Sequence, residues 1–314
     1  MKKPVFYGVI SSIFFAFTFI LNSSMNLSGG SFIWSASLRY IFMLPILYII
    51  LIKNNKVKAV HLAITKNIKP WILWSTIGFG LFYAPLTFAS SYGQSWLVAG
   101  CWQITIVCGI LLTPLFNKKI PIRNLLMSLI IILGVFLIQY EQATAINLSG
   151  ALLSIIPIII AAFSYPLGNR KMMEICKDEL DTFQRIYGMT LCSMPFWIIL
   201  SIFGIIKDGL PGSNQIFQSF IVAIFSGVIA TYLFFKATDM AKNNSRELAI
   251  VESTQSGEVL FTILGEILIL KGSIPNKIGL LGLLLIILGM ILNSTLPSNE
   301  KKIKKVIKED TLVN

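Results

Sequence analysis

The sequence predicts an all-helical polytopic membrane protein, with ten transmembrane helices arranged as two inverted five-helix repeats. Of the 314 residues, 55% are hydrophobic and only 13% are charged, and the mean hydropathy is +0.77. A soluble domain cannot hide that much apolar surface. Apolar runs of about 18 to 24 residues recur along the chain, and each is long enough to cross ~30 Å of hydrocarbon as a helix. Parts of the first half also recur in the second half.

The apolar runs define ten expected spans that occupy most of the chain. Their limits are 5–21, 31–52, 71–91, 95–116, 122–140, 149–167, 184–206, 216–235, 247–270 and 276–295. The first run has the basic flank of a signal peptide, but no small-x-small cleavage site follows it, so we interpret it as the first span.

The loops between these spans divide the basic residues by side. Alternate loops and the tail hold 22 of the 26 Lys and Arg residues, whereas the opposite loops hold only Lys207, Lys271 and Lys277. By the positive-inside rule, this asymmetry predicts cytoplasmic termini in a multi-pass protein of the cell membrane. The net charge of +12 therefore indicates contact with membrane lipids rather than with nucleic acid.

Three spans of the first half carry polar or aromatic residues at depth. Arg39 in the second span must pair with an acidic group or face water. It could pair with Glu258 or Glu266 as a gating or structural ion pair. Tyr83 lies near mid-depth in the third span. Trp102 and Gln103 occupy the middle of the fourth span, where they either line a central site or fill the core and bond a neighbouring helix.

Two short motifs recur in the same order half a chain apart. "AFTFIL" at 16–21 is followed by "AFSYPL" at 162–167, and "IPIRNLL" from Ile120 by "IPNKIGLL" from Ile274. The expected repeats are residues 1–146 and 147–296, with a basic cytoplasmic tail at 297–314. Because each repeat has an odd number of spans, the second enters the membrane inverted, which is typical of secondary transporters with a site at the midplane.

The ninth span contains three carboxylates, Glu252, Glu258 and Glu266. At ~1.5 Å rise per residue, Glu258 lies near the midplane and Glu266 near the outer end. A charge at mid-membrane costs a few kcal/mol unless it faces a wet cavity, is paired, or is protonated. We interpret Glu258 as a proton or substrate site, with a buried hydrogen bond as the alternative. Glu252 could instead pair with a basic residue at the inner end, and packing or snorkelling suffices for Glu266.

Helical geometry places Gln255 between Glu252 and Glu258, about 60° from each. The repeat puts Ile104 opposite Glu258, so the fourth span offers Trp102 and Gln103 at the depth where the ninth offers carboxylates. An aromatic face attracts a cation and a carboxylate neutralises it. The predicted site therefore suits a flat or lipophilic cation.

These segments resemble the drug/metabolite transporter superfamily, with "LRYIFMLP" at 38–45 and "GEILILKGSIP" at 265–275 as the matching segments. The stretches 30–45 and 78–107 resemble its ten-span multidrug resistance efflux transporter family. The resemblance covers nearly the whole chain except the last ~18 residues. It implies two inverted five-helix halves, export of small molecules and coupling to protons, and Glu266 matches a glutamate that ends this span across the superfamily. The first span has no acid, so the first-helix glutamate mechanism of the four-span exporters does not transfer.

No enzyme motif accompanies these features. GxxxxGK[ST], HExxH and GxSxG are absent, and the four cysteines form no CxxC. We expect no enzyme activity and no cofactor other than a coupling proton. The first hypothesis is a proton-coupled exporter of amphipathic or cationic compounds, and the second is an exporter or facilitator of a polar metabolite such as an amino acid or nucleobase. A non-transporting scaffold or lipid-handling protein is the third. The sequence leaves open a monomer or a homodimer.

Overall fold

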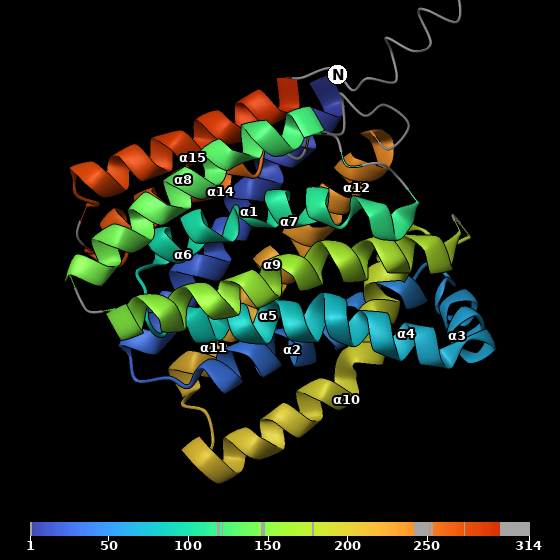
Figure 1. Ribbon diagram of the computed structural model, residues 1–314. Coiled ribbons are helices and arrows are strands. Elements are labelled where there is room, and N and C mark those ends of the chain that lie inside the picture. Colours follow the sequence, from blue (N-terminus) through green and yellow to red (C-terminus); the bar gives the residue numbers. More distant parts are fainter. Residues whose placement is uncertain are drawn as a thin grey trace, which may run out of the picture.

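The computed structural model describes residues 2–117, 120, 122–145, 148–177, 179–241, 251, 254–272 and 274–295. Helices make up most of this part of the chain, and it contains no β-strand (Figure 1). The prediction of an all-helical polytopic membrane protein is confirmed.

The helices follow one another with short connections. In the first half they are α1 (Lys2–Leu27), α2 (Phe32–Ile52), α3 (Val57–Lys66), α4 (Ile68–Ser75), η1 (Thr76–Gly80), α5 (Leu81–Ala89), α6 (Ser95–Trp102), α7 (Thr105–Leu111), η2 (Thr113–Phe116) and α8 (Ile122–Ala145). In the second half they are α9 (Leu148–Cys176), α10 (Thr182–Asp208), α11 (Ser213–Val222), η3 (Ala223–Ala230), α12 (Thr231–Ala241), α14 (Ser256–Leu268) and α15 (Lys277–Thr295).

Every expected span overlaps a helix or an interrupted helix. Six are long and apolar enough to cross a membrane: 3–27, 32–52, 68–89, 148–176, 182–208 and 213–241. The other four expected spans coincide with α6 and α7, with α8, with α14 and with α15, whose described apolar stretches, such as 95–111, 125–141 and 277–292, are shorter. The number of crossings therefore stays a prediction.

Several spans are not regular α-helices. The third expected span contains the π-helical segment η1, and the eighth contains η3. The expectation of one continuous fourth helix is wrong, because a turn at Gln103 and Ile104 separates α6 from α7. The backbone N–H groups of these two residues donate to the carbonyls of Gly100 and Cys101, both at 3.1 Å, which tightens the chain locally.

The helices pack in pairs that join the two halves of the chain. α8 packs along α15, α2 along α10 and α6 against α14. α5 contacts α9, and α1 contacts α12. Exchanging the two halves maps the first three pairings onto themselves and converts the α5–α9 contact into the α1–α12 contact, as a repeat would. The boundaries of the repeats and their inverted orientation stay predictions.

Close backbone contact holds α8 against α15, and the two helices lie side by side at one edge of the molecule (Figure 1). A Cβ atom on Gly134 would lie 2.5 Å from the carbonyl oxygen of Gly282, and one on Gly282 would lie 2.7 Å from the carbonyl oxygen of Gly134. Small residues allow helices to approach this closely within a bilayer, where dispersion contacts replace the hydrophobic effect as the driving force.

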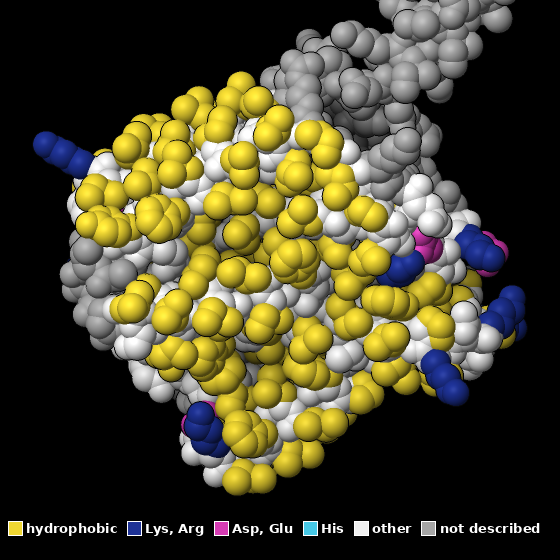
Figure 2. All heavy atoms as spheres, viewed as in Figure 1, with side chains coloured by type: hydrophobic (Ala, Val, Ile, Leu, Met, Phe, Trp, Pro, Cys, Tyr) yellow, Lys and Arg dark blue, Asp and Glu magenta, His cyan; other side chains and the backbone are white. Residues whose placement is uncertain are grey.

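The outer surface of the helices is apolar. Figure 2 shows a face covered mainly by hydrophobic side chains, with Lys and Arg gathered near its borders. Large side chains such as Ile199, Phe203 and Leu284 are more than half exposed. A surface of this kind fits lipid rather than water.

We expect Gly282→Val to weaken the α8–α15 contact, because its side chain has no room beside Gly134. Overpacking of this kind costs about 1–3 kcal/mol. Thermal melting of the purified protein should show a lower midpoint for Gly282→Val than for Leu281→Val, a control at a position that is 52% exposed. Equal midpoints would contradict the close contact.

Candidate functional site

A small cavity lies at the centre of the helices. Its volume is about 30 Å³, which is roughly the space that one water molecule occupies. It is lined by Phe15, Thr18, Phe19, Arg39, Tyr40, Met43, Phe79, Phe82, Leu86, Trp102, Tyr165, Thr231, Gln255 and Glu258. These residues come from both halves of the chain, so neither half contains the site alone.

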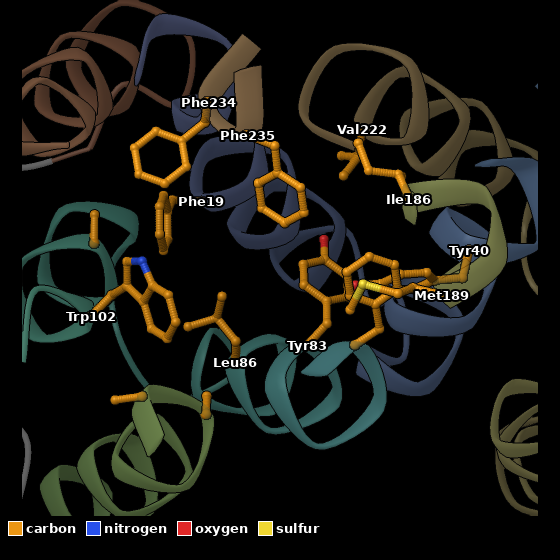
Figure 3. Close-up of a cluster of buried hydrophobic side chains, with 14 of the residues drawn as sticks. Phe19, Tyr40, Tyr83, Leu86, Trp102, Ile186, Met189, Val222, Phe234 and Phe235 are labelled. Carbon is orange, nitrogen blue, oxygen red and sulfur yellow. The ribbon is translucent and has the colours of Figure 1, made fainter. Parts of the chain in front are cut away.

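One wall of the cavity is an aromatic cluster of Phe82, Trp102 and Tyr165. The ring centroids of Phe82 and Tyr165 are 4.8 Å apart, and those of Phe82 and Trp102 are 5.1 Å apart. Tyr165 meets Trp102 edge to face at 5.7 Å. Figure 3 shows Trp102 close to Phe19 and Leu86. Such rings offer flat apolar surface and attract cations to their faces.

The lining also contains Arg39, whose guanidinium is buried among aromatic rings. Its Cζ atom lies 4.1 Å from the ring centroid of Tyr83 and 5.7 Å from that of Tyr40. Its Nη1 atom donates a hydrogen bond of 3.3 Å to the hydroxyl of Thr18. Its Nε–H group is buried and has no hydrogen-bond partner among the residues that the structure describes. Rings and a hydroxyl hold this charge, but they leave part of its bonding capacity unused.

Glu258 lies in the first turn of α14, where the chain enters the helix after Gln255. Only 2% of the residue is exposed. The amino end of a helix favours a negative charge nearby, so the local backbone supports a carboxylate at this position. The Gln103 side chain lies near the Glu258 carboxyl, and its own N–H group donates to the Ala99 carbonyl at 3.2 Å. The turn that ends α6 thus brings a neutral amide to the acid of the other half.

The cavity unites most of the residues predicted from the sequence. Glu258, Gln255 and Trp102 line it, and Gln103 lies next to Glu258. Tyr83 is fully buried behind the Arg39 guanidinium. Glu252 lies outside the described residues. Gln255 precedes α14 at a turn, so the helical wheel that placed it between two glutamates does not apply, although it does reach the cavity.

The predicted ion pair of Arg39 with Glu266 is wrong. The carboxylate of Glu266 instead accepts hydrogen bonds from the Ser95 backbone N–H, at 3.1 Å, and from the Ser95 hydroxyl. These bonds tie α14 to the start of α6, so Glu266 is placed for helix packing. Arg39 also forms no ion pair with Glu258, and among the described residues the ion pairs involve other side chains.

Sequence reasoning missed several lining residues, although the repeat marked two of them. The motifs "AFTFIL" and "AFSYPL" align Phe19 with Tyr165, and both residues line the cavity. The motif residue Thr18 supports Arg39. Phe82 and Tyr40 carried no signal of their own, because an aromatic residue in an apolar span is ordinarily a packing residue.

A wider pocket of about 550 Å³ lies at one end of the helices. Met25, Ser28, Trp34, Phe88, Asp208 and Gln215 are among its lining residues. Along α1, Thr18 lines the central cavity and Met25 lines this pocket, and Asn22 lies between them. The Asn22 amide donates to the Tyr83 hydroxyl at 3.2 Å. This contact joins α1 to α5 between the residues that line the two pockets.

Polar contacts join α10 to α12 at the end of the helices opposite the wide pocket. Arg185 Nη2 lies 3.5 Å from Asp239 Oδ1, and the Thr182 hydroxyl donates to Asp239 Oδ2 at 2.7 Å. The Arg185 guanidinium also lies 5.0 Å from the Phe235 ring centroid. Nearby, Lys56 Nζ bonds Asp181 at 2.5 Å, and this hydrogen bond raises the pKa of Lys56. These contacts join α10 to α12 at the end of the helices near the basic loops.

Comparisons with known proteins cover nearly the full length of the chain. The sequence model of a family described as "EmrE: Putative multidrug resistance efflux transporter" matches residues 2–299. The uncharacterised protein YjlA of Bacillus subtilis strain 168 is 51% identical over 316 residues, which cover 96% of this chain and 97% of that protein.

One further relative and one solved structure are each similar over most of the chain. An uncharacterised 42.1 kDa protein of Shouchella clausii, from the 3′ region of the intracellular alkaline protease, is 48% identical over 82% of this chain and 70% of its own length. A crystal structure with 11% sequence identity has a TM-score of 0.62 and covers 93% of this chain and 96% of its own. At that identity the likeness concerns the fold alone.

The bonds between Glu266 and Ser95 should stabilise the protein. We expect Glu266→Ala to lower the free energy of unfolding by about 1–3 kcal/mol, because Ser95 then loses its buried acceptor. Combined with Ser95→Ala, the effect should be clearly less than additive when melting curves are compared. Ser91→Ala, in the preceding loop, serves as the control and should add independently; full additivity with Ser95→Ala would refute the contact.

Proposed function

Because this chain belongs to the EmrE family of efflux transporters, we propose that it exports small amphipathic, positively charged compounds in exchange for protons. The observation that supports this proposal is Glu258, a buried carboxyl group in an aromatic-walled cavity that draws residues from both halves. Aromatic faces and one acid match the chemistry of a lipophilic cation.

Exchange follows from competition at this carboxyl group. A carboxylate buried in hydrocarbon is stabilised by water, by a cation or by a proton. A cation bound to the carboxylate and a proton bound to it exclude each other, because both neutralise the same charge. A substrate that arrives as a cation therefore displaces the proton, and a returning proton displaces the substrate. Glu258 would in this way couple the two flows without any other cofactor.

A transport cycle requires the cavity to open alternately at its two ends. With about 30 Å³ of space, the cavity is too small for a drug-sized compound, so it would have to widen to bind one. The Asn22–Tyr83 bond and the Arg185–Asp239 pair are the contacts that would break in turn. The paired contacts between the halves support inverted repeats that rock against each other, with residues 1–146 and 147–296 as the moving units.

The positive-inside distribution supports placing the chain in the cell membrane with both termini in the cytoplasm. In that orientation the Arg185–Asp239 contact faces the cytoplasm and the wide pocket faces outward. Export would then begin at the basic end and finish at the wide pocket.

A second candidate is the transport of a neutral polar metabolite. The buried Oε1 atom of Gln103 has no hydrogen-bond partner in the described part of the chain, and Gln255 lines the cavity. Two amides could recognise a polar molecule without any change of charge. This candidate predicts binding without proton release, which separates it from the first.

Addition of tetraphenylphosphonium to unbuffered purified protein should release about one proton per bound cation if Glu258 is the shared site. The pH change is followed with an indicator dye. Glu258→Gln should abolish the release, because glutamine carries no proton to exchange.

Glu266→Gln is the matched control, since it alters another buried carboxyl group of the same helix and should leave proton release intact. Release that persists in Glu258→Gln would remove Glu258 from the coupling mechanism.

In proteoliposomes with the membrane potential clamped, a pH difference should drive the accumulation of tetraphenylphosphonium. One-for-one exchange gives a concentration ratio of about tenfold for each unit of pH difference. Radiolabelled substrate measures the ratio, with Glu258→Gln vesicles as the control. Wild-type flux that ignores the imposed pH difference would exclude proton coupling.

A further inference from the structure

A group of lysines surrounds α3, the short helix between the second and third expected spans. Residues 53–70 contain five lysines and no Asp or Glu, and all five lysines are exposed. They are Lys53, Lys56, Lys58, Lys66 and Lys69. In Figure 2, Lys and Arg side chains gather at the right border of the apolar face, on the side where Figure 1 places α3. This segment therefore presents a strongly positive surface.

Most of this charge is not neutralised by the protein. Lys56 bonds Asp181 at 2.5 Å. The other four lysines form no ion pair with any described residue. We call these four residues the lysine surface: Lys53, Lys58, Lys66 and Lys69. Their ammonium groups are available to anions outside the protein.

The lysines of α3 lie on the side of the helix that faces away from the rest of the protein. Val60 and Ile64 are buried and form the packed side of α3. At about 100° per residue, Lys58 and Lys66 project to the opposite side, with Leu62 between them. Leu62 is 52% exposed. Positive charges interspersed with an exposed apolar side chain are typical of a helix at a membrane surface.

The lysine surface also borders the lipid-facing parts of two neighbouring helices. Ile49 and Ile52, at the end of α2, are about half exposed, and Lys53 follows them directly. Leu73 of α4 is about half exposed as well, one helical turn after Lys69. Exposed apolar side chains fit the acyl chains of lipids. The lysines next to them are therefore placed at the level of the lipid headgroups.

Contacts with α10 fix the position of α3. The His61 Nε2 atom lies 3.1 Å from the Tyr187 hydroxyl, within hydrogen-bond distance. The Gln184 side chain donates to the backbone carbonyl of Lys56, also at 3.1 Å. A surface that is already held in shape loses less conformational entropy when it binds a partner.

We infer that the lysine surface binds the headgroups of anionic phospholipids in the surrounding bilayer. The ammonium groups contact the lipid phosphates, while the exposed side chains of Leu62 and Ile68 lie among the acyl chains. At 1.5 Å rise per residue, Lys58 and Lys66 are about 12 Å apart along the helix axis, so the surface accommodates more than one headgroup. A soluble acidic partner would leave the apolar side chains without a role, which favours the membrane.

A fluorescent label on α3 tests this site in full-length protein reconstituted into phosphatidylcholine vesicles. The four native cysteines are buried, so a thiol-reactive fluorophore attaches selectively to Thr65→Cys, at an exposed position of α3. Lipids that carry a nitroxide near the head of the acyl chain quench a fluorophore that they contact. Nitroxide phosphatidylglycerol should give half-maximal quenching at a mole fraction about tenfold or more below that of nitroxide phosphatidylcholine. Each lysine near an anionic surface contributes about fivefold in affinity.

Neutralising the lysines should remove this preference without disturbing the fold, because the substituted side chains are exposed. The variant combines Lys58→Gln, Lys66→Gln and Lys69→Gln. The matched control removes three exposed lysines from the opposite loops and should keep the preference; it combines Lys207→Gln, Lys271→Gln and Lys277→Gln.

A second label controls for a general enrichment of anionic lipid around the protein. Leu210 is 79% exposed beyond the end of α10, where the charges of Lys207 and Asp208 offset each other. A fluorophore on Leu210→Cys should be quenched equally by the two lipids. In the protein labelled at Thr65→Cys, high salt should reduce the preference, because it screens exposed charges.

Equal quenching of the Thr65→Cys label by the two lipids would overturn the inference and would leave a solvated surface or one that meets a soluble acidic partner. A preference that survives the α3 variant, is lost in the outer-loop control, or does not respond to salt would overturn it as well. None of these measurements involves Glu258 or a transported cation. Their failure therefore leaves proton exchange standing, and failure of proton release leaves the lipid site standing.

Discussion

The structure depends on the cost of keeping two ionisable side chains, Glu258 and Arg39, away from water and lipid. Hydrocarbon supplies no hydrogen bonds, so each group must find its partners within the protein. Arg39 contacts the Thr18 hydroxyl and the face of Tyr83. Glu258 lies near the Gln103 amide, at the amino end of α14. Most of the polar chemistry in the middle of the molecule surrounds these two side chains.

The backbone is irregular in the same region. A break in the helical ladder leaves N–H and C=O groups unpaired, and a bilayer tolerates this only where protein or a cavity covers the break. The turn between α6 and α7 places Gln103 beside Glu258, and the turn before α14 places Gln255 at the cavity. The π-helical segments η1 and η3 occur in the third and eighth expected spans, which the repeat makes equivalent. Irregular backbone therefore accompanies the site in both halves.

Different contacts join the helices on the two sides of the cavity. An ion pair with a threonine hydroxyl joins α10 to α12 at the basic end, whereas a single neutral hydrogen bond joins α1 to α5 at the other. The ion pair is 3.5 Å long and 28% of the Asp239 side chain is exposed, so its contribution is modest. The wide pocket lies beyond the Asn22–Tyr83 contact.

Composition and apolar run length determined the all-helical membrane class, because only helices of that length satisfy their backbone within hydrocarbon. The mid-membrane acid made Glu258 a site residue, and the repeat pointed to Trp102 and Gln103 at the same depth. Tertiary structure alone decided the partners of the buried polar side chains. Glu266 accepts hydrogen bonds from Ser95 instead of pairing with Arg39, and the fourth expected span is interrupted at Gln103. Contacts between residues such as Arg39 and Tyr83 depend on how distant helices cross, and a periodic sequence pattern specifies which face of a helix is polar but not which helix will meet it.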